Sequence, residues 1–232
     1  MRFLRTTAFL GAATAVLLAA APSAAVAATD DLSTLKAAVS ARIDLRLAAL
    51  SKDTAAITAA KHLTDSDKST LTSLISADTA AMNSLKTKVA GETTAAGVKA
   101  DATSMVDDYR IFILVGPKVR LTIAGDAEQA AITKLQAVHD KLAGLVAKAK
   151  AAGKDTTAAE QDLADMAAAI TKAQGSLSGQ VAAVLAIQPG PDGTGIRAKV
   201  ATVRAGIGTT RASLKTAVAD AKKVTAFLKS VK

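Results

Sequence analysis

Apolar residues recur along most of this chain at steps of three, four or seven. In the first such stretch the apolar positions are Leu32, Leu35, Val39, Ile43, Leu50 and Ile57. Because an α-helix turns once every ~3.6 residues, positions with these spacings share one face. The pattern predicts a helix from Asp31 to near His62, with one apolar and one polar face.

Five further stretches continue the same spacing and predict helices over residues 64–91, 95–115, 117–153, 157–188 and 196–231. Their ends carry local signals. These signals are Thr64 as an N-cap, Thr93 or Thr94 as the next one, a T-x-x-E capping box from Thr157 to Glu160, and Gly91 and Gly153 as helix ends. The only long polar connection is the Gly/Pro linker at 189–195, which reads PGPDGTG.

The predicted fold class is all-α. Short connections favour antiparallel neighbours, and the alternating steps of three and four in the last helix are typical of coiled-coil-like packing. We therefore expect an elongated up-and-down bundle of five or six long helices. Residues 28–232 are expected to form this bundle as a single domain.

The N-terminus has the pattern of a signal peptide. Arg2 and Arg5 precede an apolar run over residues 6–21, and Ala25-Val26-Ala27 offers a cleavage site. The interpretation is a cleaved signal peptide at 1–27 and a secreted or extracellular protein. The alternative is an uncleaved signal anchor. Removing the leader leaves 27 basic and 20 acidic residues, a formal charge of +7, and the chain has no cysteine.

The stretch 107–126, DDYRIFILVGPKVRLTIAGD, differs from the alanine-rich segments on either side. Gly116-Pro117 predicts a kink or a short loop, because proline lacks an N–H and restricts the residue before it. We interpret Ile111–Val115 as helix or helix end. Polar side chains flank this apolar run. The candidate site residues are Asp107, Asp108, Tyr109, Arg110, Lys118 and Arg120.

This polar cluster has two interpretations. In the structural one, the charges pair across the kink while Tyr109 packs in the core with its hydroxyl at the edge. In the functional one, the charges surround a binding groove beside Tyr109 and Phe112. The structural interpretation is favoured, because a tyrosine at heptad spacing is usually a core residue.

No catalytic, cofactor-binding or metal-ligating set is predicted. His62 and His139 are the only histidines, and a metal site needs three or four converging donors. The chain has no G-x-S-x-G motif, and thiol catalysis is excluded without cysteine. The glycines of the 189–195 linker lack the lysine of a phosphate-binding loop. We expect a protein that is not an enzyme.

The expected function is a structural or interaction role at the cell envelope, as a secreted non-enzymatic helical protein. The alternative is a binder of an anionic envelope polymer or lipid, through basic helix faces or an interhelical groove. Scattered lysines without stacking aromatics argue against specific nucleic-acid recognition. The partner is unknown, a cell-wall polymer or an envelope protein being the candidates. Oligomerisation and association with the cell wall are open.

Three segments carry a resemblance to a known family. They are TDSDKSTLTSLISADTAAMNSLKTKV at 64–89, DYRIFILVGPKVRLTIAGD at 108–126 and AGKDTTAAEQDLADMAAAI at 152–170. In these the chain resembles uncharacterised exported all-helical proteins of actinobacteria. The resemblance implies export and a helical fold, and it assigns no activity and no catalytic residue. The linker at 189–195 departs from the asparagine-bearing segment of that family.

Overall fold

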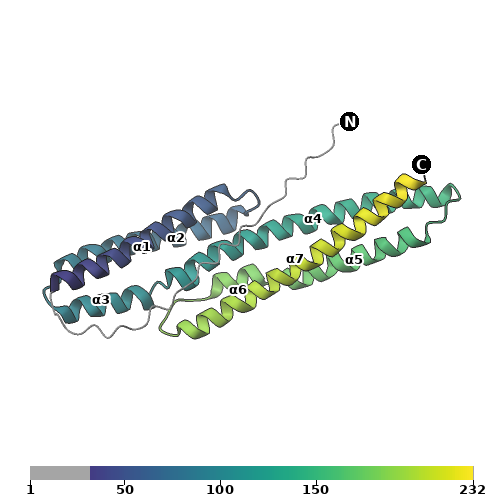
Figure 1. The fold of residues 1–232 in the computed structure, drawn as a ribbon. Helices are drawn as coiled ribbons and strands as arrows, with labels where there is room; N and C mark the ends of the chain where they lie inside the picture. The colour runs from purple at the N-terminus through teal and green to yellow at the C-terminus, as the bar shows by residue number, and fades with distance from the viewer. Residues whose placement is uncertain (1–31, 232) are drawn as a thin grey trace.

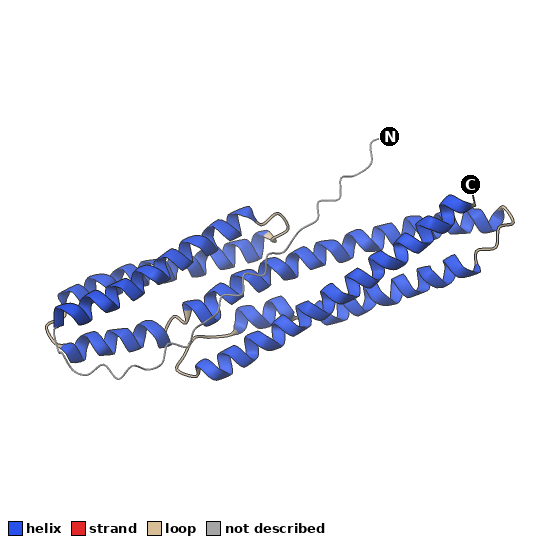
Figure 2. Cartoon of the chain, in the orientation of Figure 1, coloured by secondary structure: helices blue, strands red, loops and turns tan. Residues whose placement is uncertain are grey.

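The computed structural model describes residues 32–231, all of them in helices and short connections (Figure 2). The predicted signal peptide at 1–27 lies outside the described residues. No strand occurs within 32–231, which confirms the all-α prediction. In chain order the elements are α1 (Leu32–Ala59), α2 (Asp65–Gly91), α3 (Ala95–Asp107), the π-helix η1 (Ile111–Val115), α4 (Gly116–Ala151), α5 (Thr157–Leu177), α6 (Gln180–Ala186) and α7 (Gly193–Ser230).

Five of these helices, α1, α2, α4, α5 and α7, have 21 residues or more. They pack side by side into an elongated bundle, as predicted (Figure 1). The α1–α2 hairpin packs along α3, η1 and the first part of α4, which follow one another end to end. The helices α5, α6 and α7 pack along the rest of α4.

Two apolar clusters form the core. One joins α1, α2 and α3 to η1 and the start of α4, and contains Ile43, Leu71 and Val119. The other joins α4 to α5, α6 and α7, and contains Met166 and Val203 among many others. The helix α4 contributes to both clusters. That residues 28–232 fold as a single domain stays a prediction; the structure shows two clusters that meet at η1 and the start of α4.

Several helix ends follow from local chemistry as predicted. Thr64 and Thr94 are N-caps, and their hydroxyl oxygens accept the N–H groups of Asp67 at 3.2 Å and Gly97 at 3.1 Å. These bonds satisfy donors that the first helical turn leaves unpaired. At the end of α4, Gly153 takes the left-handed conformation with φ 77° that glycine adopts without strain.

The predicted capping box of α5 is wrong by one residue. The N-cap is Thr156 and not Thr157. The Thr156 hydroxyl donates to Glu160 Oε1 at 2.8 Å, and the Asp155 carboxylate accepts the Thr157 N–H at 3.0 Å. A carboxylate two residues before an N–H reaches it readily. Asp155 therefore accepts an N–H group of the first turn of α5, a role that the T-x-x-E pattern had predicted for the side chain of Thr157.

The predicted kink or loop at Gly116-Pro117 is also wrong. The helix breaks earlier, where Arg110 takes a left-handed conformation with φ 47° and ψ 38°. The π-helix η1 then passes into α4 without a loop. Pro117 falls in the first turn of α4, where a missing N–H leaves no helical bond unmade. Beyond Arg110 the helical phase is reset, so Phe112 is exposed instead of continuing the face of Tyr109.

The segment expected as one helix from Thr157 to the linker is interrupted. Gly179, with φ 73°, separates α5 from α6. The linker is shorter than predicted, because α7 begins at Gly193, inside residues 189–195. Asp192 caps it by accepting the Gly195 N–H at 2.8 Å.

Candidate functional site

The six predicted site residues lie where α4 passes from one apolar cluster to the other. They form two groups. Asp107, Asp108, Tyr109 and Arg110 surround the break between α3 and η1, and Lys118 and Arg120 lie in the first turns of α4. Within residues 32–231 no hydrogen bond or ion pair joins the two groups. The six residues therefore do not form one cluster.

Arg110 attaches the linker to the helix break. Its Nε donates to the carbonyl of Gly190 at 2.7 Å, and its Nη2 donates to the carbonyl of Pro191 at 2.6 Å. Nη2 also pairs with Asp107 Oδ1 at 2.7 Å. Only 11% of the Arg110 side chain is exposed. The arginine is therefore a structural tie between two segments 80 residues apart, which spacing in the sequence does not reveal.

The other residues at this break have local contacts. Asp108 accepts a hydrogen bond from the hydroxyl of Ser104, one turn earlier in the chain. Tyr109 is half-buried and packs against the cluster of α1, α2 and α3. This placement agrees with the structural interpretation, in which the ring fills the core.

Lys118 is buried between the two halves of the molecule. Its Nζ donates to the carbonyl of Leu185 in α6 at 2.9 Å. Asp78 in α2 supplies the facing charge. Burial raises the pKa of Asp78 to about 6, against the opposing attraction of Lys118. Burial also lowers the pKa of Lys118, and Asp78 opposes that shift.

Arg120 lies at the surface, and its Nη1 is 4.0 Å from Asp53 Oδ1 of α1. Burial raises the pKa of Asp53, with the Arg120 charge opposing the shift. Because Arg120 is 63% exposed and the two atoms are 4.0 Å apart, this pair contributes little to stability.

A small pocket of about 200 Å³ opens beside the helix break. Three arginines line it, Arg46, Arg110 and Arg197, together with Phe112. The Arg46 guanidinium lies over the Phe112 ring, 5.2 Å from its centroid. Of the three arginines, only Arg110 has an acidic partner within the described residues. The pocket is positively charged, but the Arg110 guanidinium is already bonded to the linker.

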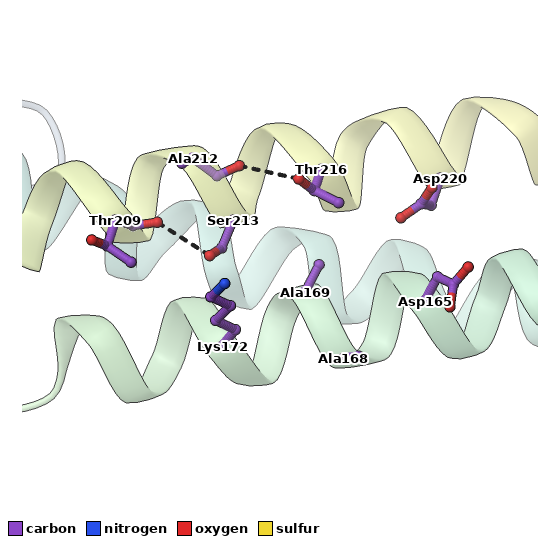
Figure 3. A pocket seen from close by; sticks show the side chains of 9 residues that line it. All are labelled: Asp165, Ala168, Ala169, Lys172, Thr209, Ala212, Ser213, Thr216 and Asp220. Atoms are coloured by element: carbon purple, nitrogen blue, oxygen red, sulfur yellow. Dashed lines mark hydrogen bonds between the residues drawn. The ribbon is translucent and has the colours of Figure 1, made fainter.

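A second groove, of about 500 Å³, lies between α5 and α7 (Figure 3). The hydroxyl groups in this groove donate to carbonyl groups of their own helix, α7. Ser213 donates to the Thr209 carbonyl at 3.1 Å, and Thr216 donates to the Ala212 carbonyl at 3.4 Å. Asp220 pairs with Lys223 at 2.7 Å. The hydrogen bonds of Ser213 and Thr216 and the ion pair of Asp220 with Lys223 thus stay within α7.

A third groove, of about 540 Å³, lies between α4 and α7. Its floor is apolar and its edges are basic. The floor residues are Ala131, Leu135, Leu214, Val218 and Ala219, and the basic ones are Lys134, Arg211, Lys215 and Lys222. Arg211 pairs with the buried Glu128 at 3.1 Å. The three lysines have no acidic partner within the described residues, so their charges face solvent.

The lysines of this groove belong to two longer rows with seven-residue spacing. The rows are Lys134, Lys141 and Lys148 on α4, and Lys215, Lys222 and Lys229 on α7. Residues seven apart lie on nearly the same side of a helix. The sequence analysis did not identify these rows, although the seven-residue spacing that located the apolar faces also relates these lysines.

Within residues 32–231, no three histidine or acidic side chains are arranged to share a metal ion. His139 lies beside Asp140, with Nδ1 3.1 Å from Oδ1, on an exposed part of α4. None of the described helices is both long enough and apolar enough to cross a membrane.

Comparison with protein-family models, with curated proteins and with solved structures finds no match for this chain. The resemblance to exported helical proteins of actinobacteria therefore stays a prediction.

Proposed function

We propose that this protein is a secreted, non-enzymatic interaction protein of the cell envelope, and that it binds an anionic envelope component through the α4–α7 groove. The observation that carries the proposal is the pair of lysine rows along an apolar groove. Unpaired cations in a row attract an extended anion, whereas cations bonded to nearby carboxylates do not.

The acidic residues of α4 and α7 do not neutralise the lysines of this face. After Glu128, the only acid in α4 is Asp140, which is one residue before Lys141 and so about 100° around the helix. The only acid in α7 is Asp220, which is buried and paired with Lys223. Glu128 itself is covered by Arg211. The face is therefore positive over its whole length, which favours an anionic partner.

The test is retention of the purified protein on isolated cell envelopes at rising salt. A groove variant carries Lys134→Gln, Lys215→Gln and Lys222→Gln. A control variant carries the same change at three exposed lysines elsewhere, Lys52, Lys68 and Lys99. Both variants lose the same net charge, so they separate position from total charge.

We expect the unchanged protein and the control to be retained and then released as salt screens the charges. The groove variant should be released at clearly lower salt. Equal behaviour of the two variants, or no retention of the unchanged protein, would overturn the proposal. A hydrolytic or transferase activity lost on a single carboxylate change would overturn its non-enzymatic part.

A further inference from the structure

From the α4–α7 groove we infer the class of partner: the groove binds the surface of a lipid bilayer that contains anionic lipid. The inference rests on the proposed function and makes its ligand specific. It begins from the chemistry of the groove lining. All nine lining residues are alanine, leucine, valine, lysine or arginine. A polymer of sugars or polyols is usually held by hydroxyl, amide or aromatic side chains, and the lining contains none of these.

The positions of the exposed apolar residues agree with a bilayer surface. Val138 and Leu145 on α4 are 40% and 48% exposed, and Val218 on α7 is 40% exposed. By helical angle, Val138 and Leu145 lie between Leu135 and the lysine row of α4, and Val218 lies between Leu214 and the lysine row of α7. The face thus has an apolar centre and two basic edges.

The two helices present this face as one strip. α4 and α7 pack side by side and run in the same direction (Figure 1). The first and last lysines of each row are 14 positions apart, or ~21 Å at 1.5 Å per residue. A lysine beside an apolar strip can lay its methylene stem on the bilayer while its ammonium reaches a lipid phosphate. A strip of this length meets several lipid headgroups at once.

The same features limit the depth of contact. The chain has no tryptophan, and three exposed aliphatic side chains supply a shallow apolar contact. Binding should therefore be reversible and dominated by charge. Each lysine near an anionic surface contributes about 1 kcal/mol, so removing three should weaken binding about 100-fold.

The experiment is sedimentation with vesicles of phosphatidylcholine alone or mixed with phosphatidylglycerol, at several salt concentrations. Besides the groove and control lysine variants, it uses an apolar variant that carries Val138→Ser, Leu145→Ser and Val218→Ser. Circular dichroism at 222 nm checks that each variant keeps its helices.

We expect binding to the mixed vesicles and not to phosphatidylcholine alone. The groove variant should lose about 100-fold in affinity, the control should match the unchanged protein, and the apolar variant should lose about tenfold with an unchanged salt dependence. An apolar variant that binds the mixed vesicles normally would overturn the inference, because charge alone would then explain binding.

Two further outcomes separate this inference from the proposed function. If the protein ignores the mixed vesicles but is retained, through the groove lysines, on wall polymer freed of lipid, the bilayer inference fails and the proposed function stands. If the groove and control variants weaken vesicle binding equally, the attraction comes from net charge alone and both fail.

Discussion

Because the carboxyl group of Asp78 is buried, we predict that mild acid stabilises the protein. Asp78 is 9% exposed, and its Oδ2 has no hydrogen-bond partner. Burial raises its pKa from 3.8 to about 6. Because the folded state then holds the proton more tightly than the unfolded state, the stabilisation by protonation is complete below about pH 3.8. It is lost as pH rises through about 6.

The size of the effect follows from these two pKa values. One pKa unit corresponds to about 1.36 kcal/mol, so the limiting difference is about 3 kcal/mol. Lowering the pH from about 8 to about 5 should increase the free energy of unfolding by about 1 kcal/mol through Asp78 alone. Burial also raises the pKa of Asp53, Asp126 and Glu128, and these groups act in the same direction.

Exposed carboxyl groups act in the opposite direction but at lower pH. Hydrogen bonds to side chains lower the pKa of Asp140 and Glu160, and hydrogen bonds from Thr157 lower that of Asp155. The stability that these groups contribute is lost only as pH falls through their lowered values. It is therefore intact over the interval from about pH 8 to about pH 5.

The assay is urea denaturation followed by circular dichroism at 222 nm, at several values between about pH 5 and about pH 8. Asp78→Asn should remove about 1 kcal/mol of the pH dependence. Lys118→Met should steepen the pH dependence. The lysine charge opposes the rise of the Asp78 pKa, so its removal lets this pKa rise further. An Asp78→Asn protein with the unchanged pH profile would refute the reasoning, as would a Lys118→Met protein with a flatter one.

Two further predictions use matched pairs of substitutions and the same denaturation assay. A Cβ added to Gly125 in α4 would lie 2.5 Å from Val181 Cγ2, whereas nothing lies within 4 Å of one added to Gly144 in the same helix. Gly125→Ala should therefore destabilise by about 1–3 kcal/mol and Gly144→Ala should stabilise by about 0.5–1 kcal/mol, and the reverse order would contradict the packing of α6 on α4. Arg110→Ala should cost about 2–3 kcal/mol, because it removes three hydrogen bonds of a side chain that is 11% exposed. Arg120→Ala, at 63% exposure, should change stability by less than about 0.5 kcal/mol, and similar losses for both arginines would show that Arg110 does not hold the linker.

Much of the fold could be predicted because its determinants are local. Apolar residues at steps of three and four define helix faces without reference to the rest of the chain. The caps at Thr64 and Thr94 depend on a hydroxyl and an N–H three residues apart. The end of α4 at Gly153 depends on one residue that takes φ 77°. Such signals are complete within one turn of helix, and the structure confirms them.

The breaks that the sequence placed wrongly have causes outside the segment. Pro117 ends a helix only if it falls beyond the first turn, and its position in that turn depends on where the helix begins. The helix begins after Arg110, whose left-handed conformation accompanies hydrogen bonds to the carbonyls of Gly190 and Pro191. Those partners are 80 and 81 residues away. The sequence pattern near Pro117 therefore cannot predict where this helix begins.

In the candidate site, too, the local features could be predicted and the remote contacts could not. The sequence located residues 107–126 by their composition, and the structure places them where both apolar clusters meet. The partners of the individual side chains are remote. Lys118 bonds to Leu185 and faces Asp78, and neither pairing follows from spacing. The lysine rows were within reach of sequence reasoning, because seven-residue spacing on one helix is a local property.

The placement of the basic face follows from the length of the α1–α2 hairpin. The hairpin ends against the first third of α4, where the Thr64 N–H donates to Asp126 Oδ2 at 2.7 Å (Figure 1). Before that point α4 is covered by helices on both sides, and most of its residues are buried. Beyond it, the side that the hairpin covered is open to solvent, and within about 60° of it around the helix lie Lys141 and Lys148. A hairpin longer by two heptads would bury this side and would need apolar residues there. The lysines occupy this side because the short hairpin leaves it exposed, so the length of the hairpin decides which part of α4 can carry a basic face.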